Sequence, residues 1–517
     1  MKYVHPIVVN IVAIFLLTVG TGIPTYGQAD TTKQYIDVSL LAGYTSNEVV
    51  PFWMRSNQFG SIPLKGASGG VLVRAAKNYA YQGEWIDRGE KSASNWDWGY
   101  GVEARTNVGS TTKVQLIDAH VKARYAMFEA KLGRTKDVMG LNGDTLLSSG
   151  NFAVSGNALG VPMLDFRIPE YYRLPWFDGL LSFKGNFANG YMGNVLVDER
   201  QLIGDHAESF PTFLHQKSLY GRLGRSHWRV NLYGGINHQV QFGSEKKIHG
   251  DIYTLNNLET LWHVFWGIPY GVPGIPKSKL GNHGGSVDLG FSYDWDQIQL
   301  TAYRQNFYDI GAISKLANIA DGLNGITLTN KHYNSTNKIW DWQKLLFEFF
   351  YSKNQAGYPW SRSTKSGDEN YYNNYFYSEG WSYKSRGIGS PLIVPAHDAK
   401  EGQVSDPKRY FISNRVVAAH VGIRGKVHNW EVNSKLTFSK HYGTFATSQH
   451  GSSLGDVFTP PTHGIFTPVS QFSTHLAGER ELQNNFFFGI RVALDQGELF
   501  DNSIGGQISL RKSFGRR

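Results

Sequence analysis

Apolar and polar residues alternate with a period of two along most of the chain. In one such segment, Ile117, Val121 and Tyr125 fall on one face. Asp118 and Lys122 fall on the opposite face of the same segment. This period is typical of β-strands, because successive side chains of a strand point to opposite sides of the sheet. The pattern therefore predicts strands that have one apolar and one polar face.

The alternation recurs as far as the C-terminus, in segments that are often joined by short turns. The further alternating segments are 128–132, 181–187, 228–232, 287–293, 298–302, 417–423, 430–438, 486–494 and 504–514. Turns at His428–Asn429 and at Asp294–Asp296 predict antiparallel hairpins. Phe514 stands near the end of the final alternating segment, which resembles the terminal signal of bacterial outer-membrane barrels. Three residues, 515–517, follow this phenylalanine.

The composition agrees with a large β structure. Among 517 residues there are 58 Gly, 30 Phe, 28 Tyr and 14 Trp, no Cys, and 18% charged residues. So many aromatic residues exclude intrinsic disorder, and the absence of cysteine excludes disulfides and thiolate metal sites. A soluble β-sandwich or propeller would also alternate, but we find no propeller-like repeat of about 40–50 residues. The strongly charged polar faces favour a barrel with a watery interior.

The N-terminus has the features of a signal peptide. Lys2 precedes an apolar run from Ile7 to Val19, which is shorter than the ~20 residues of a membrane-spanning helix. Small residues then predict cleavage near Gly27 or Ala29, which gives a signal peptide over residues 1–27 and one domain over residues 28–517. Without a further apolar helix, the chain can cross a membrane only as a closed barrel. We therefore expect an all-β, transmembrane, antiparallel outer-membrane β-barrel of about 16–18 strands with long extracellular loops.

Two segments depart from the period of two and predict short helices in these loops. Leu255–Phe265 has helical spacing; it follows Asp251 and ends before Gly267. Ile313–Leu323 could form a second helix, closed by Gly325. Such a helix would either fold into the lumen as a plug or belong to an external loop, and the sequence leaves both possibilities open.

The stretch between residues 360 and 391 combines aromatic and basic side chains. Aromatic faces stack on sugar rings, and Arg and Lys pair with uronate or phosphate oxygens. The net charge of +9 also favours an anionic polymer. The candidate polysaccharide-binding residues are Trp360, Arg362, Tyr371, Tyr372, Tyr377, Trp381, Tyr383, Lys384 and Arg386. The alternative is that the aromatic residues pack the loops and that the excess charge contacts anionic lipopolysaccharide.

Motifs for catalysis are weak. The run Gly66–Gly70 matches G-x-S-x-G, but a strand and not a helix follows it, so it predicts a turn. The 17 histidines are not spaced as metal ligands, and we expect neither a metal nor a cofactor. Nucleic acid is not an expected partner of an exported chain. Nothing argues positively for an enzyme, although a hydrolase with Ser and His on adjacent barrel strands would leave no local signature and stays open.

A series of short motifs resembles the capsule-assembly Wzi family as it occurs in Bacteroidetes. The motifs are Ser148–Ala158 followed by Ile168–Pro169, Leu214–Lys217, Gly234–Gln239, Tyr303–Phe307, Leu345–Glu348 with Lys353–Gln355, and Tyr371–Asn374 leading to Gly380–Trp381. The resemblance implies an outer-membrane β-barrel of about 18 strands. It also implies a non-enzymatic, lectin-like protein that helps attach and organise capsular polysaccharide, with other capsule-export components as possible partners. No binding residue is carried over from the family.

The leading hypothesis is therefore an outer-membrane, lectin-like protein that binds and helps assemble or retain capsular or extracellular polysaccharide. The alternative is a porin or channel for oligosaccharides or other small solutes. An embedded hydrolase ranks last.

Overall fold

The computed structural model describes residues 34–79, 95–110, 112–198, 207–225, 227–271, 278–309, 311–333, 339–357, 368–454 and 457–515. The expected signal peptide lies outside the described residues. No helix among those described is both long enough and apolar enough to cross a membrane.

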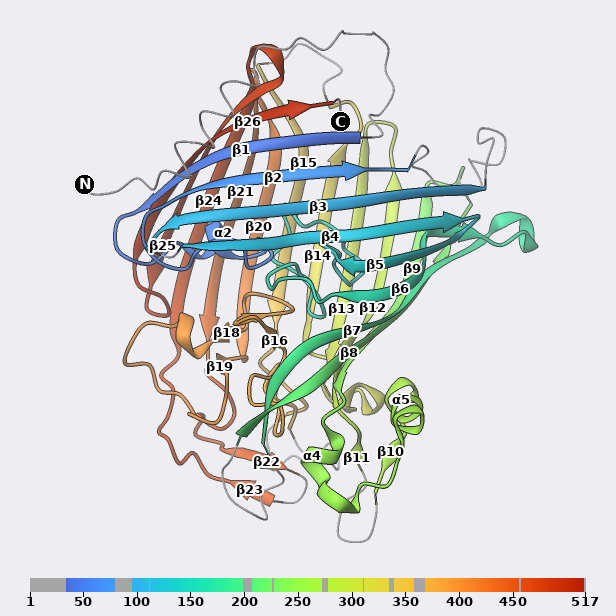
Figure 1. Cartoon of the computed structure of the whole chain (residues 1–517), viewed down its shortest axis with the longest axis vertical. Helices are drawn as coiled ribbons and strands as arrows, with labels where there is room; N and C mark the ends of the chain where they lie inside the picture. The colour runs from blue at the N-terminus through green and yellow to red at the C-terminus, as the bar shows by residue number, and fades with distance from the viewer. Residues whose placement is uncertain are drawn as a thin grey trace.

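Eighteen antiparallel strands form one closed sheet (Figure 1). They are β1 Gln34–Thr45, β2 Ser68–Lys77, β3 Trp96–Gly109, β4 Lys113–Tyr125, β5 Phe128–Arg134, β6 Met163–Arg173, β7 Leu181–Asp198, β8 Ala207–Leu223, β9 Val230–Phe242, β12 Asn282–Asp294, β13 Ile298–Tyr308, β14 Gly322–Asn330, β15 Trp340–Tyr351, β20 Val416–Val427, β21 Trp430–His441, β24 Val469–Glu481, β25 Phe486–Gly497 and β26 Ser503–Phe514. Pairing of β1 with β26 closes the ring. The predicted outer-membrane barrel is confirmed, with 18 strands.

The other elements of the described residues are short and lie in the connections. They are α2 Phe52–Arg55, η2 Trp176–Gly179, α4 Glu245–His249, η3 Gly250–Ile252, α5 Asn257–Trp266, η4 Ala312–Lys315, η6 Ala396–Asp398 and η7 Gln483–Asn485. Four two-stranded ladders accompany them: β10 Pro269–Tyr270 with β11 Ser278–Lys279, β16 Ser382–Tyr383 with β17 Arg386–Gly387, β18 Val394–Pro395 with β19 Phe411–Ser413, and β22 Ser452–Leu454 with β23 Val457–Thr459.

The two ends of the barrel differ in the length of their connections. One end carries tight turns such as 126–127 and 428–429, together with the start of β1 and the end of β26. The other end carries the long connections 135–162, 243–281, 352–415 and 442–468. Outer-membrane barrels have short periplasmic turns and longer extracellular loops. We therefore assign the end with long connections to the cell exterior.

The wall has an apolar outer face and a polar inner face. On β26, Ile504 and Ile508 are exposed on the outside, whereas Gln507 and Arg511 point into the lumen and are buried. Exposed aromatic residues gather at the short-turn end of the barrel: Trp96, Trp98, Tyr125, Phe128, Trp228, Trp295 and Trp340. Aromatic girdles of this kind mark the membrane interfaces of outer-membrane barrels.

A β-bulge changes which residues of β4 point outward, relative to the prediction from the sequence. In the pairing of β3 with β4, Glu103 lies opposite Asp118, but the next residue, Ala104, lies opposite Leu116. The extra residue, Ile117, is buried, and Leu116 takes the exposed outer position. A bulge inserts one unpaired residue and so reverses the alternation beyond it. The prediction that Ile117 shares the outer face with Val121 was wrong for this reason.

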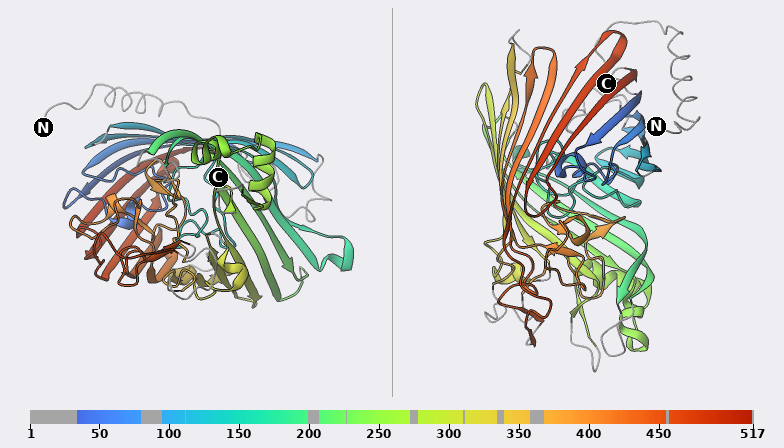
Figure 2. Two further views of the ribbon diagram at one scale, coloured as in Figure 1. Left: turned by 90° about the horizontal axis from the view of Figure 1, so that it is seen from below. Right: turned by 90° about the vertical axis from the view of Figure 1, so that its left-hand side faces the viewer.

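Segments from the long connections fold inward and fill the lumen. Figure 2 (left) shows these ribbons inside the ring of strands. Their buried side chains form one hydrophobic cluster that includes Trp53, Phe152, Tyr372, Trp381 and Phe466. We call these inward segments, within 51–62, 135–162, 368–415, 442–454 and 457–468, the plug.

Of the two predicted loop helices, one forms. Helix α5 begins after Asn256, whose side chain accepts from the backbone N–H groups of Leu258 and Glu259, and it ends at Gly267, where φ is +63°. Asp251 therefore does not cap it. The helix packs on the outer face of the barrel, through Val264, and so is not part of the plug.

The second predicted helix is wrong. Only the short turn η4 forms, and Leu323 belongs to strand β14. Gly325 does not end a helix but lies inside β14, where a Cβ atom would come within 2.1 Å of the Tyr303 ring. This glycine is present because an aromatic side chain occupies the adjacent space.

An ion-pair cluster joins two parts of the plug. The carboxylate of Asp398 accepts from Arg55 Nη1 at 2.6 Å and from Arg386 Nη1 at 2.8 Å. Both arginines are buried, and the side chain of Asp398 is 10% exposed. Burial raises the pKa of the Asp398 carboxyl, but the two guanidinium groups outweigh this effect and hold that pKa below its ordinary value. The cluster therefore stabilises the plug while Asp398 is ionised.

We predict that Asp398→Ala loosens the plug, because it leaves two buried guanidinium groups without a carboxylate. The expected cost is about 3–5 kcal/mol of local stability. Hydrogen exchange of segment 384–410, corrected for the intrinsic rate at each pH, measures it. In the wild type the stabilisation should be complete above the unfolded-state pKa of about 3.9 and should be lost as pH falls through the lower folded-state pKa.

The matched control is Asp178→Ala, since the carboxylate of Asp178 is 82% exposed beside Arg225. It should leave the exchange of segment 384–410 unchanged. Equal exchange in Asp398→Ala and the wild type at neutral pH would contradict the assigned role of this cluster.

Candidate functional site

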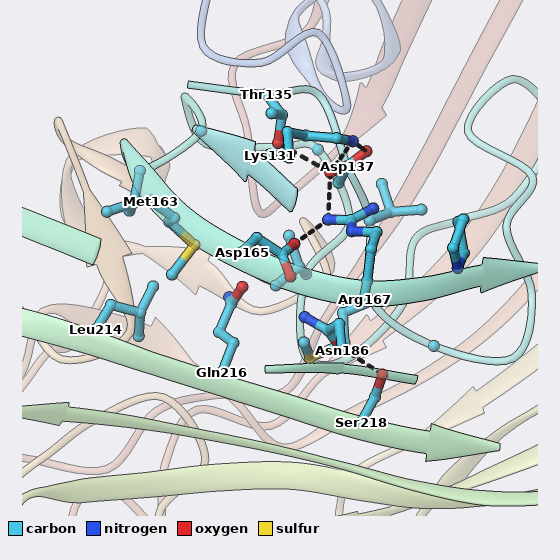
Figure 3. Close-up of a pocket in the computed structure, with 18 of the residues that line it drawn as sticks. Lys131, Thr135, Asp137, Met163, Asp165, Arg167, Asn186, Leu214, Gln216 and Ser218 are labelled. Atoms are coloured by element: carbon cyan, nitrogen blue, oxygen red, sulfur yellow. Dashed lines mark hydrogen bonds and ion pairs between the residues drawn. The ribbon is translucent and has the colours of Figure 1, made fainter. Parts of the chain in front are cut away.

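A cavity of about 210 Å³ lies between the plug and the inner wall (Figure 3). One side is formed by inward residues of strands β5 to β8, and the other by the plug segment 135–161 together with Ile388. Its volume is below the roughly 300–1,000 Å³ of sites for drug-sized ligands. The cavity therefore suits a small polar molecule, such as a single sugar residue.

The charged wall of the cavity follows from strand alternation and register. Glu129 and Lys131 point inward from β5, and Asp165 and Arg167 point inward from β6. In the pairing of the two strands, Lys131 lies opposite Asp165, and Glu129 lies opposite Arg167. Opposite charges therefore face each other across both pairs, which stabilises an antiparallel pair of strands.

Asp137 extends this network from the plug side. Its carboxylate accepts from Lys131 Nζ at 2.9 Å, Arg167 Nη2 at 2.7 Å and Thr135 Oγ1 at 3.1 Å. Arg167 also donates to Asp165, and Figure 3 shows both contacts of this guanidinium. The network therefore ties the segment after β5 to the wall and fixes one edge of the cavity.

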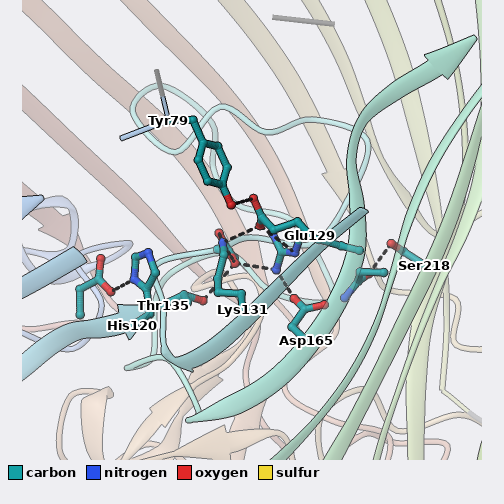
Figure 4. A network of polar contacts seen from close by, with 11 residues as sticks. Tyr79, His120, Glu129, Lys131, Thr135, Asp165 and Ser218 are labelled. Atoms are coloured by element: carbon teal, nitrogen blue, oxygen red, sulfur yellow. Dashed lines mark hydrogen bonds and ion pairs between the residues drawn. The ribbon is translucent and has the colours of Figure 1, made fainter. Parts of the chain in front are cut away.

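One further contact holds a member of this network, and another holds two polar residues elsewhere in the cavity wall. The hydroxyl of Tyr79 donates to Glu129 Oε2 at 2.8 Å (Figure 4). On β8, Ser218 Oγ donates to Asn186 Oδ1 of β7 at 2.5 Å. The site residues are thus held by partners on several strands, as a preorganised polar site requires.

Lys184 is the cavity cation that the network does not use. It points inward from β7, and its ammonium lies 4.9 Å from the centre of the Tyr171 ring and 5.8 Å from that of Tyr220. Among the described residues, no carboxylate pairs with it and no acceptor takes a hydrogen bond from it. Lys184 is therefore available to an anionic oxygen of a ligand.

The cavity wall also carries neutral hydrogen-bonding groups. Amide groups of Asn186 and Gln216 and hydroxyls of Ser218 and Tyr220 add hydrogen-bonding partners to its charged edge. Across the part of the chain that the structure describes, no three His, Cys, Asp or Glu side chains come together as a metal site.

The structure places most of the predicted polysaccharide-binding residues inside the plug. Six are buried: Tyr371, Tyr372, Tyr377, Trp381, Tyr383 and Arg386. Lys384 is exposed. Trp360 and Arg362 lie outside the described residues. In this arrangement a polymer cannot reach the six buried side chains. Polysaccharide binding by the nine residues stays a prediction.

The contacts of the buried residues explain their position. The hydroxyl of Tyr371 donates to Asp321 Oδ2 at 2.8 Å, and the hydroxyl of Tyr372 donates to the backbone oxygen of Phe152. Arg386 is held by Asp398. These side chains therefore build the plug core and connect it to other loops.

Sequence reasoning missed the cavity residues. The alternation around 128–132 placed Glu129 and Lys131 on a polar face, but the sequence does not reveal which strand lies beside them. Their partners, Asp165 and Arg167, follow from the register of β5 with β6. The signal in the sequence was a pair of opposite charges two residues apart in each strand, Glu129 with Lys131 and Asp165 with Arg167.

The closed barrel with its apolar outer face defines an outer-membrane β-barrel. No family model matches the chain, and no curated protein matches it. Its fold is similar to that of Wzi of Escherichia coli, an outer-membrane protein involved in group 1 capsule assembly and described as a carbohydrate-binding β-barrel. That likeness covers 93% of this chain and 84% of Wzi, at 9% identity and a TM-score of 0.51.

Two other solved barrels are less similar. Pseudomonas aeruginosa OccK2, solved with glucuronate, shows 8% identity over 95% of this chain and 100% of that chain, with a TM-score of 0.41. Acinetobacter baumannii OccAB2 shows 10% identity over 95% of this chain and 100% of that chain, with a TM-score of 0.43. At these identities, the likeness to Wzi shows a shared fold.

We predict that Lys184→Met weakens the binding of an acidic sugar to the cavity. A hydrogen bond to a charged group contributes roughly 1.5–3 kcal/mol, so affinity should fall about 10- to 150-fold. Calorimetric titration of the purified barrel with galacturonate measures this, and galactose serves as the neutral ligand. Lys246→Met, at an exposed lysine of α4, is the control and should change nothing. Equal affinities in Lys184→Met and the wild type would contradict a role for Lys184 in binding.

Proposed function

We propose that this protein binds capsular or extracellular polysaccharide at the cell surface and helps to assemble or retain it. The observation that carries the proposal is the barrel fold shared with Wzi, which is itself described as carbohydrate-binding. The motifs between residues 148 and 381 that resemble the Wzi family support the same reading. The plug also supports it, because loops that fill the lumen suit a binding protein better than an open channel.

The finer parts of the proposal come from the sequence. We infer membership of the Wzi family in its Bacteroidetes form, export through a signal peptide cleaved near Gly27 or Ala29, and an anionic polymer as partner. Lipopolysaccharide and other capsule-export components are further proposed partners. The protein performs no chemical step in this proposal.

The proposed mechanism is non-covalent and multivalent. A polymer offers many equivalent sugar units, so several weak contacts add up to firm attachment. Lys384 is exposed on the β15–β20 connection, and Trp360 and Arg362 belong to the same connection. In the proposal these three make direct contact, while Trp381 and Arg386 hold the connection in place from within the plug.

Deletion of the gene in the native host should release polysaccharide into the medium, because the polymer would still be made but would lose its attachment. Cell-attached and released polysaccharide are measured separately. A copy with Trp360, Arg362 and Lys384 changed to Ala should restore attachment only partly, whereas the Lys246→Ala control should restore it fully. Unchanged attachment in the deletion strain would refute the proposed function.

A channel for oligosaccharides or other small solutes is the second candidate. The observation in its favour is the polar cavity inside the lumen, with the cation Lys184 on its wall. If the plug fills the lumen as described, the purified barrel should show little conductance in planar bilayers. Asp398→Ala should raise that conductance, because it loosens the plug. Large, steady conductance of the wild type would favour the channel.

A further inference from the structure

The described part of the connection between β9 and β12, residues 243–271 and 278–281, leaves the rim and folds back over the outside of the barrel. Its helix α5 is seen at the lower right of Figure 1. Gln239 and Gln241 of β9 point into the lumen, where they donate to the backbone oxygens of Ala153 and Gly380 in the plug. The residue between them, Val240, therefore points outward. It is nevertheless fully buried, because this connection covers it.

Helix α5 covers polar groups on the outer face of the wall. His215 and Lys217 of β8 point outward, since Gln216 between them lines the lumen cavity. The Phe265 ring of α5 lies 5.6 Å from the His215 ring, and its backbone oxygen accepts from Lys217 Nζ. Polar groups that face lipid without a partner are costly. The helix supplies that partner to Lys217, and it covers His215, whose Nδ1 lies 3.1 Å from Asn189 Oδ1.

The covered groups lie at the height of the membrane. Lys217 is six residues from Leu223, the last residue of β8 at the short-turn end. Six residues span about 20 Å along a strand, or about 14 Å along the barrel axis at a tilt near 45°. The lipid-facing band of such barrels is about 25 Å tall. Helix α5 therefore begins to cover the wall within this band or at its outer edge.

The other face of α5 is apolar and exposed. Leu258, Trp262 and Trp266 are spaced by four residues and form one stripe. Their exposed fractions are 79%, 59% and 58%. The stripe continues an apolar surface, since Leu219 is 57% exposed on the same outer face of β8, two residues from Lys217. Phe265 also packs on Phe187, an outward residue of β7.

We propose that α5 is seated in the outer leaflet of the membrane, with Leu258, Trp262 and Trp266 inserted between the lipids. Three observations point to lipid as the occupant: continuity with the lipid-facing wall, the height of the covered groups, and two Trp side chains, which favour the membrane interface. Helix α5 thus covers the polar residues His215 and Lys217 and presents its own apolar stripe to the lipid. The proposal is independent of polysaccharide binding.

The chain has no cysteine, so a single introduced cysteine can carry a fluorescent label at one known place. Trp262→Cys tests the stripe, and Gln449→Cys, at an exposed position of the β21–β24 connection, is the control. Each variant is labelled with an environment-sensitive dye and reconstituted into phosphatidylcholine vesicles with brominated acyl chains. Bromolipid should quench the label at 262 at least three times more strongly than the label at 449. Aqueous iodide should show the opposite order.

Two results would overturn the proposal. Equal quenching of both labels by iodide would place α5 in water. A label at 262 that neither quencher reaches would place the stripe against protein, such as a second copy of this chain. Leu258→Cys repeats the test should Trp262→Cys fail to fold, and heat-modifiable gel mobility verifies folding of each variant.

Discussion

Closure of the sheet between β1 and β26 is the constraint on which the rest of the structure depends. The pairing runs from Ile36 opposite Phe514 to Thr45 opposite Gly505. Because lipid cannot satisfy backbone polar groups, a barrel must leave no strand edge unpaired. Closure also fixes the register, since a slip by one residue would turn Asp37 into the lipid and Val38 into the lumen. The apolar outer face and polar inner face follow from this single requirement.

A barrel of this width encloses more space than its wall residues fill, and the plug occupies it through polar contacts. Glu348 of β15 accepts from Ser148 Oγ and from the backbone N–H of Ser149, both at 2.7 Å. An inner wall made of polar side chains needs partners of this kind, because a buried carboxylate without them is costly. The motif that begins at Ser148 is therefore one of the points where the plug is fixed to the wall.

The strands could be predicted from the sequence because their period is a local property. The bulge at Ile117 could not, since it depends on which residue of β3 lies opposite. The burial of Tyr371 and Trp381 could not be predicted either, because an aromatic, basic stretch has the same composition whether it binds sugars or packs inside a plug. The cavity network needs the register of β5 with β6, which no single segment contains. Long-range pairing thus decides what the local pattern leaves open.

Hydrogen-bonded residues of the plug connect the exposed part of the β15–β20 connection to the internal cavity. Ser155 of the plug binds the backbone of Ile388 and Gly389 at 3.1 and 2.6 Å, and Ile388 also lines the cavity. Lys384, on the surface, is four residues away along the chain. The same plug segment carries Asp137 at the other edge of the cavity. Because packed segments move as units, a polymer that displaced the connection at Lys384 would have to disturb this wall of the cavity as well. The plug is thus the element through which surface binding and the lumen could influence each other.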